Sequence, residues 1–278
     1  MTDILPLIAL LLGVGALAGF TAGLFGIGGG AVMVPALFFA FAAIGVDPDV
    51  LMHCAVATSA SVIIVNGYRS TRSHLARDSV AMDLLWPSPW WRSYALWIGL
   101  GAFMGAWWLA PRLGSDGLTL VFACVAMIVS AQFIFGRPSF TLRERVPGGM
   151  APPLVGGSVG ALSAIMGIGG GSFSVPLLTL CGMPVHRAIG TAAGFGLAIA
   201  VPATIGFIIS GWGVAGRPPG SLGYVNLVGF GMIVASAWFA VPIGTASAHR
   251  LDATLLRRIF GLCLALVAIN MARKAGLF

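Results

Sequence analysis

The chain has 278 residues, of which 58% are hydrophobic and only 8% are Asp, Glu, Lys or Arg, and its formal net charge is +7. Soluble domains are about 25% charged, so this composition excludes a soluble enzyme and a disordered chain. It also excludes a nucleic-acid-binding protein, because the basic residues are scattered between apolar runs instead of clustering on one face. The composition predicts an all-α polytopic membrane protein in a lipid bilayer.

The first half of the chain contains five apolar segments, at about 4–24, 31–45, 50–67, 93–110 and 117–136. The first segment follows Asp3 and no basic residue precedes it, which favours a membrane helix over a cleaved signal peptide. The connection at 68–92 carries Trp86, Trp90 and Trp91, and we expect these rings at the headgroup level.

The second half contains five more apolar segments, at about 151–167, 172–182, 187–211, 222–246 and 254–274. At 1.5 Å per residue, segment 172–182 spans only about 16 Å, roughly half of the bilayer core. Its counterpart 31–45 is also short. Both are candidate half-helices, and their hairpins either cross the membrane fully or turn back inside it, where irregular backbone must be buried in protein.

An internal repeat relates the two halves. GFTAGLFGIGGGAVMVPAL at 19–37 matches GALSAIMGIGGGSFSVPLL at 160–178 with a constant offset of 141 residues. HCAVATSA at 53–60 matches HRAIGTAA at 186–193 with an offset of 133 residues. The alternative interpretation is two similar hairpins whose glycines serve only helix packing.

The repeat predicts two inverted units, residues 1–145 and residues 146–278. Each unit has five segments, an odd number, so the second unit must enter the membrane from the opposite side, as in many secondary transporters. With the N-terminus outside, eleven Lys and Arg residues lie on the inner side and four on the outer side. This positive-inside bias predicts a multi-pass protein of the plasma membrane with both termini outside.

Two glycine clusters are the first candidate binding elements. Each precedes an apolar helix, and together they comprise Gly28, Gly29, Gly30, Gly169, Gly170 and Gly171. Glycines let the backbone approach a ligand closely, and a helix that begins there offers free N–H groups and the positive end of its dipole. The clusters therefore predict an anion site near the membrane midplane. A nucleotide-binding P-loop is not expected, because no Lys-Ser/Thr pair follows the last glycine.

Hydroxyl groups in the third segment of each half are further candidates for substrate binding: Thr58, Ser59 and Thr191. Asn66 lies seven residues after Ser59 on the same face, where it either caps the helix or faces the cavity. The alternative for the hydroxyls is a bond to their own i−4 carbonyl.

His53, His186 and Arg187 are candidates for proton coupling or for a gate. The two histidines match in the repeat and histidine titrates near neutral pH, while Arg187 would attract anions at the inner mouth. The alternatives are interfacial histidines with satisfied rings and an arginine that only anchors the inner side.

No acidic residue lies in the middle of a predicted segment, because all eight Asp and Glu residues fall in loops or at segment ends. A cation pathway or a carboxylate proton relay would need one there, so we expect a small anionic substrate. The four cysteines form no CxxC motif, and we expect neither a metal site nor a cofactor.

The paired GIGGGxxxVPxL motifs in a ten-segment chain resemble those of the TauE/SafE family of membrane permeases, the sulfite exporter family. HRAIGT at 186–191 looks like the start of the family's following helix. The resemblance covers essentially the whole chain and implies transport of sulfite, sulfonates such as sulfoacetate, or related organic acids across a bacterial-type plasma membrane. The family's first-half motif often reads GTS, whereas this chain has Ala57-Thr58-Ser59, so the two halves need not contribute equally to binding.

These observations favour a secondary transporter that works by alternating access around the two glycine clusters. The alternatives are an anion channel, which would conduct without saturation, a transporter of small carboxylates, and an intramembrane enzyme, which would need a catalytic set of residues. A purely structural role would leave the duplicated glycines without a purpose. The substrate, the coupling ion, the transport direction and the oligomeric state, a homodimer included, stay open.

Overall fold

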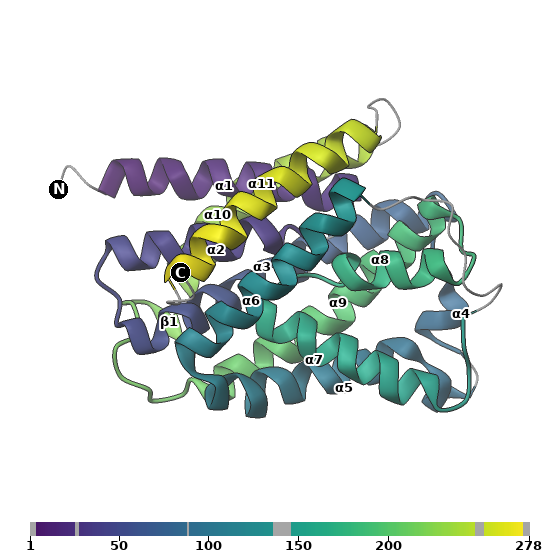
Figure 1. Ribbon diagram of the computed structural model, residues 1–278, viewed down its shortest axis with the longest axis horizontal. Helices are drawn as coiled ribbons and strands as arrows, with labels where there is room; N and C mark the ends of the chain where they lie inside the picture. The colour runs from purple at the N-terminus through teal and green to yellow at the C-terminus, as the bar shows by residue number, and fades with distance from the viewer. Residues whose placement is uncertain (1–3, 26–27, 88, 136–145, 248–252, 275–278) are drawn as a thin grey trace.

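The computed structural model describes residues 4–25, 28–87, 89–135, 146–247 and 253–274. These residues are mostly helical, and Figure 1 shows a bundle in which most helices run lengthwise while α11 crosses it obliquely. Together with the apolar composition, this architecture confirms the predicted fold class, an all-α polytopic membrane protein.

The first half of the chain forms α1 (Ile4–Phe25), α2 (Gly30–Ala43), α3 (Pro48–Leu75), α4 (Met82–Leu85), the 3-10 turn η1 (Trp90–Arg92), α5 (Tyr94–Met104) and α6 (Ala110–Phe135). A π-helical stretch, η2 (Gly105–Leu109), joins α5 to α6 without a break. Gly114 then interrupts the helix with φ 67° and ψ 176°. This interruption separates the segments that the sequence predicts at 93–110 and 117–136.

The second half forms the π-helical stretch η3 (Pro152–Gly156), α7 (Gly157–Met166), α8 (Gly171–Leu180), α9 (Val185–Ser210), α10 (Leu227–Ser247) and α11 (Ala253–Lys274). Before α10 the chain forms an antiparallel hairpin of β1 (Ser221–Leu222) and β2 (Val225–Asn226). The predicted segment 222–246 therefore begins too early, because the hairpin occupies its first residues.

Helix α3 is longer than the predicted segment 50–67. Pro48 occupies its first turn, and the Asp47 carboxylate caps it by accepting the N–H of Asp49. At the other end the helix continues to Leu75 through a polar stretch, with basic side chains in its last turn where they complement the helix dipole. Hydrophobicity predicts that the helix ends with the apolar run, whereas the helical backbone continues beyond it.

Four helical stretches of the described chain are long and apolar enough to cross a membrane: Pro48–Leu75, Tyr94–Phe135, Val185–Ser210 and Leu227–Ser247. The segments predicted to be short are short, because α2 has 14 residues and α8 has 10. At 1.5 Å per residue, α8 is only about 15 Å long. Figure 1 shows that the α1–α2 hairpin begins and ends at the left of the bundle, and the α7–α8 hairpin at the right.

Helices from the two halves pack against each other in matching pairs. Helix α1 packs on α10 and α7 packs on α5, while α3 lies against α9 and α6 against α11. Small residues make these contacts close. A Cβ atom on Gly19 would lie 2.8 Å from the Cα atom of Ala237, and one on Gly105 would lie 2.8 Å from the carbonyl oxygen of Ala161. Such packing of small residues is typical of membrane helices.

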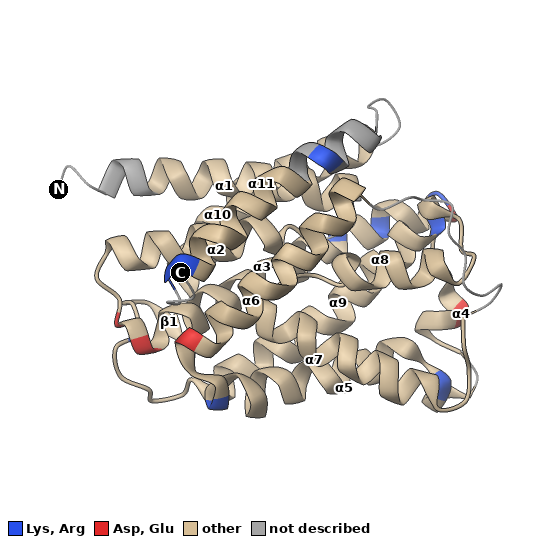
Figure 2. Cartoon of the chain, in the orientation of Figure 1, with Lys and Arg blue, Asp and Glu red and all other residues tan. Residues whose placement is uncertain are grey.

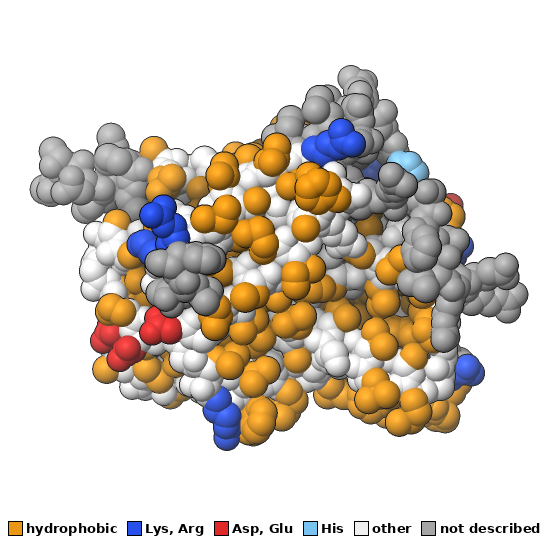
Figure 3. All heavy atoms as spheres, in the orientation of Figure 1, with side chains coloured by type: hydrophobic (Ala, Val, Ile, Leu, Met, Phe, Trp, Pro, Cys, Tyr) orange, Lys and Arg blue, Asp and Glu red, His pale blue; other side chains and the backbone are white. Residues whose placement is uncertain are grey.

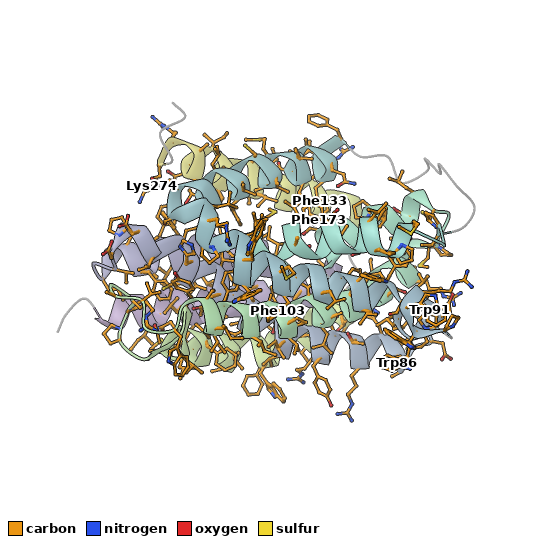
Figure 4. All side chains as sticks on the ribbon, turned by 90° about the horizontal axis from the view of Figure 1, so that it is seen from below. Trp86, Trp91, Phe103, Phe133, Phe173 and Lys274 are labelled. Carbon is orange, nitrogen blue, oxygen red and sulfur yellow. The ribbon has the colours of Figure 1, made fainter. Side chains whose placement is uncertain are left out.

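Charged residues lie toward the two ends of the bundle, and Figure 2 shows a mostly uncharged middle. Hydrophobic side chains cover much of the face in Figure 3. Figure 4 places Trp86 and Trp91 at the opposite end from Lys274. We call these ends the tryptophan end and the Lys274 end. Both tryptophan rings are exposed, as expected of side chains at a membrane surface.

Candidate functional site

The two glycine turns touch each other inside the bundle. Gly28 and Gly29 have φ values of 78° and 80°, a conformation that costs glycine little. A Cβ atom on Gly28 would lie 3.1 Å from the Cα atom of Gly169, and one on Gly30 would lie 2.7 Å from the Cα atom of Ile168. A side chain on Gly28 or Gly30 would therefore push the second turn away.

The second turn, between α7 and α8, is equally tight. Gly167 has a φ of 60°, and a Cβ atom on Gly170 would lie 2.7 Å from the backbone nitrogen of Gly196 in α9. The Ser59 hydroxyl of α3 donates to the carbonyl oxygen of Gly167 at 2.8 Å. We call the two turns and the side chains that reach them the glycine junction: Gly28–Gly30, Gly167–Gly171, Ser59, Asn66, Ser163, Ser172 and Ser174.

Two helices begin at this junction, α2 at Gly30 and α8 at Gly171. The first N–H groups of each helix have no intrahelical partner and carry the positive end of its dipole. Pro35 and Pro176 each remove one backbone donor from these short helices, which frees the carbonyl oxygen four residues earlier. The junction therefore brings the N-terminal ends of two helices together, one from each half of the chain.

Three buried serine hydroxyls lie beside the second turn and have no hydrogen-bond partner: those of Ser163, Ser172 and Ser174. Leaving a buried donor unpaired costs about 1–3 kcal/mol. At the repeat offset of 141 residues, the equivalent positions of the first half are apolar: Ala22, Ala31 and Met33. Hydrophobicity and the repeat did not point to these serines, although Ser172 directly follows the glycine cluster.

Asn66 reaches the first glycine turn from α3. Its Nδ2 atom lies 3.5 Å from the carbonyl oxygen of Gly28, and its Oδ1 atom has no hydrogen-bond partner. Asn66 and Ser59 are both fully buried. One face of α3 therefore touches both glycine turns, Ser59 the second and Asn66 the first.

Thr58 and Thr191 bind backbone groups of the opposite half. The Thr58 hydroxyl accepts the N–H of Asn226, in the hairpin before α10, at 2.9 Å. The Thr191 hydroxyl accepts the N–H of Ala81, in the connection before α5, at 2.9 Å. Thr191 also donates to the carbonyl oxygen of Arg187 at 2.8 Å, the i−4 bond that is common in membrane helices. We call these two cross-half contacts the Thr58 latch and the Thr191 latch.

The two matched histidines have different surroundings. His53 is 3% exposed, its Nε2 atom lies 3.1 Å from the Ala110 carbonyl oxygen, and its ring stacks on Tyr224 at 4.9 Å between centroids. Burial raises the pKa of the Tyr224 phenol, which therefore stays protonated. His186 and Arg187 are exposed at the start of α9. The structure therefore does not bring the three candidate gating residues together.

Buried polar side chains of the described residues are hydroxyls, amides and His53, and none is Asp, Glu, Lys or Arg. The same part of the chain contains no group of three His, Cys, Asp or Glu side chains that could hold a metal ion. An anion at the glycine junction would therefore be bound by N–H and O–H groups and by helix dipoles.

The chain contains one enzyme-like motif. GGSVG at 156–160 has the letters of the GxSxG nucleophile motif. That motif needs a strained turn between a strand and a helix, whereas Ser158 lies within α7 and donates to the Leu154 carbonyl oxygen at 2.7 Å. The motif therefore gives no support to an intramembrane hydrolase.

Comparison with known proteins identifies the family. The family model "Sulfite exporter TauE/SafE" matches residues 11–271. A "Probable membrane transporter protein" of Haemophilus influenzae is 34% identical over 269 residues, which cover 96% of this chain and 98% of the relative. A protein of the same description from Xylella fastidiosa is 30% identical over 272 residues, 93% of this chain and 92% of the relative.

A more distant relative is the "Probable membrane transporter protein YunE" of Bacillus subtilis, which is 26% identical over 280 residues, 95% of this chain and 96% of the relative. No solved structure shows significant similarity to the chain. The family model covers nearly the whole chain and these relatives are described as transporters, so the chain belongs to the sulfite exporter TauE/SafE family of membrane transporters.

Proposed function

We propose that this protein is a secondary transporter of small anions and that the anion binds at the glycine junction. The observation that carries the proposal is the meeting of two helix N-termini beside three buried serine hydroxyls without partners. Peptide N–H and hydroxyl donors stabilise an anion without a buried cation, and no Lys or Arg is buried among the described residues.

The substrate that fits best is sulfite or a small sulfonate such as sulfoacetate. An SO₃ group presents three oxygen acceptors to the hydroxyl donors of Ser163, Ser172 and Ser174. The description of the matching family model also names sulfite. Small carboxylates are the second candidate, since a carboxylate oxygen accepts from the same donors.

Alternating access follows from two inverted units, residues 1–145 and residues 146–278. Several contacts support this division, because α1 on α10 matches α7 on α5 and the two threonine latches match as well. Gly28 also touches Gly169, its own equivalent in the repeat. In the proposed cycle the Thr58 latch opens toward the Lys274 end and the Thr191 latch toward the tryptophan end, one at a time.

The proposed orientation follows the distribution of charge. The tryptophan end faces the cytoplasm and the Lys274 end faces the outside of the plasma membrane, with both termini outside. His53 and His186 then lie toward opposite sides. They are candidates for coupling to protons or for gating, together with Arg187 at the inner mouth.

A transport assay tests the proposal. Purified protein in liposomes is offered labelled sulfite, sulfoacetate, taurine and small carboxylates, with and without a proton gradient. We expect saturable uptake and counterflow of one class of anion. Conduction without saturation or counterflow would instead indicate an anion channel.

A glycine substitution tests whether the anion binds at the glycine junction. Gly170→Val should abolish transport while the protein still inserts, because a side chain there meets the backbone of α9. Gly13→Val is the matched control, since a Cβ atom on Gly13 meets nothing within 4 Å. Uptake by Gly170→Val at the wild-type rate would refute the glycine junction as the binding site.

A further inference from the structure

A second, basic pocket lies between α3 and α10, away from the glycine junction. Its volume is about 390 Å³, and its lining contains two arginines, two aromatic rings and no acidic residue. The lining residues that matter here are Tyr68, Arg69, Arg72, Trp238 and Pro242. Two guanidinium groups without a carboxylate in the lining favour an anionic occupant.

A backbone carbonyl that Pro242 leaves free orients Arg69. Pro242 has no N–H and therefore cannot bond to the carbonyl oxygen of Trp238, four residues earlier in α10. Arg69 donates to that freed carbonyl, and its guanidinium carbon lies 3.9 Å from the centroid of the Trp238 ring. A guanidinium group has five N–H donors, so Arg69 is oriented by this contact and keeps donors for a ligand.

The pocket borders the part of the surface that faces lipid. Trp238 and Tyr68, which line the pocket, are both about half exposed, and α10 exposes Phe239 by 73% and Ile243 by 58% on an adjoining face. Arg72, one turn after Arg69 on α3, is exposed as well. A ligand in this pocket would therefore meet both arginines and exposed aromatic rings.

We propose that this pocket binds the phosphate headgroup of an anionic phospholipid. Arg69 and Arg72 bind the phosphate oxygens, and the acyl chains lie beside the exposed rings of Tyr68 and Trp238. Basic pockets between membrane helices are a general mode of headgroup recognition. Inorganic phosphate shares the charged chemistry but cannot use the apolar surface, so a lipid is the better fit. The pocket does not depend on the transport proposal.

Binding measurements on the delipidated full-length protein test the assignment. Native mass spectrometry counts bound phosphatidylglycerol and phosphatidylcholine, and thermal unfolding is followed with each lipid and with inorganic phosphate. We expect phosphatidylglycerol to bind and to raise the unfolding temperature, whereas phosphatidylcholine and phosphate do neither. Each arginine should contribute about fivefold to the affinity, so Arg69→Gln/Arg72→Gln should bind phosphatidylglycerol about 25-fold more weakly.

Arg112→Gln is a matched control. Arg112 also lies over a tryptophan ring, 4.2 Å from the centroid of Trp108, and also donates to that residue's carbonyl oxygen, but it does not line the pocket. The Arg112→Gln variant should bind phosphatidylglycerol as the wild type does. Arg72→Gln alone keeps the test valid if loss of Arg69 impairs folding, because Arg72 is exposed. Equal binding of both lipids, equal binding of inorganic phosphate, or equal losses in the pocket and control variants would each overturn the proposal.

Discussion

The partnerless hydroxyls of Ser163, Ser172 and Ser174 make the unliganded fold less stable than apolar residues would. Each buried, unpaired hydroxyl costs about 1–3 kcal/mol, and the equivalent first-half residues avoid that cost by being apolar. A ligand that accepts these hydrogen bonds would recover the free energy. The serines therefore have the energetic character of binding residues and not of packing residues.

This reasoning predicts opposite effects on stability and on transport. Ser172→Ala and Ser174→Ala should leave the unfolding temperature unchanged or raise it, while each raises the KM for the anion about fivefold, the value of one lost hydrogen bond. Thermal unfolding and uptake kinetics measure the two effects. Ser130→Ala is the control, because Ser130 donates to the Gly261 carbonyl oxygen at 2.7 Å and links α6 to α11. Ser130→Ala should lower the unfolding temperature and leave the KM for the anion unchanged. A KM that stays constant in both serine variants would contradict the role.

Some residues of the junction could be predicted from the sequence and others could not. The glycine clusters and Ser59 are predicted from the repeat, and the structure brings Ser59 to Gly167. The partners of Thr58 and Thr191 could not be predicted, because each lies in a connection more than 100 residues away, as the separations of 168 and 110 residues show. Whether a hydroxyl is paired depends on such distant packing, which hydrophobic periodicity does not encode.

Helix α1 packs closely on the first glycine turn, and Gly29 makes this contact possible. Gly29 adopts a φ of 80°, and a Cβ atom there would lie 2.5 Å from the Ala18 carbonyl oxygen. Helix bounds follow the predicted segments within a few residues, except where a polar turn extends α3 and a hairpin precedes α10. Hydrophobicity predicts the buried part of an element, but capping and turn chemistry decide where it ends.

Gly29→Ala should therefore destabilise the protein, whereas Gly13→Ala should not. The left-handed conformation alone costs a non-glycine residue about 1–2 kcal/mol, and the contact with Ala18 adds to this cost. At Gly13 a methyl group meets open space within a helix, where alanine is the better helix former. Thermal unfolding of both variants in the same detergent provides the measurement. Equal unfolding temperatures would show that the first turn relaxes freely.

The two latches should control opposite ends of the protein. Thr58→Val removes the hydroxyl that accepts the Asn226 N–H and should expose Cys54, one turn earlier in α3, to a membrane-impermeant maleimide. Thr191→Val should instead expose Cys181, in the connection after α8. Both cysteines are buried, while Cys124 and Cys263 are exposed and are first replaced by serine. Labelling of the same cysteine in both variants would contradict separate latches.

Across the whole molecule, charged ends and an apolar middle define how the bundle sits in the bilayer. The count of basic residues predicts which end faces the cytoplasm, since positively charged loops are retained there. Composition and the ten apolar segments were enough to predict the fold class. The pairing of helices between the halves was not predicted segment by segment, because it depends on which small residues face each other.

The orientation can be tested by labelling from one side. In a background without cysteines, Trp212→Cys lies at an exposed position between α9 and the hairpin, and Leu75→Cys lies at the exposed end of α3. We expect an impermeant reagent to label the first in intact cells and the second only after the membrane is opened. The reverse pattern would place the tryptophan end outside.

The three serines occur in only one of the two hairpins that the repeat relates. If the two halves move against each other, the bound anion would stay with α7 and α8 while the first half moves relative to it. After an ancestral duplication, anion selectivity could then change in one half while the movement shared by both halves is kept. Exchanging the three serines with Ala22, Ala31 and Met33 should transfer anion preference to the first hairpin while the framework that moves stays the same.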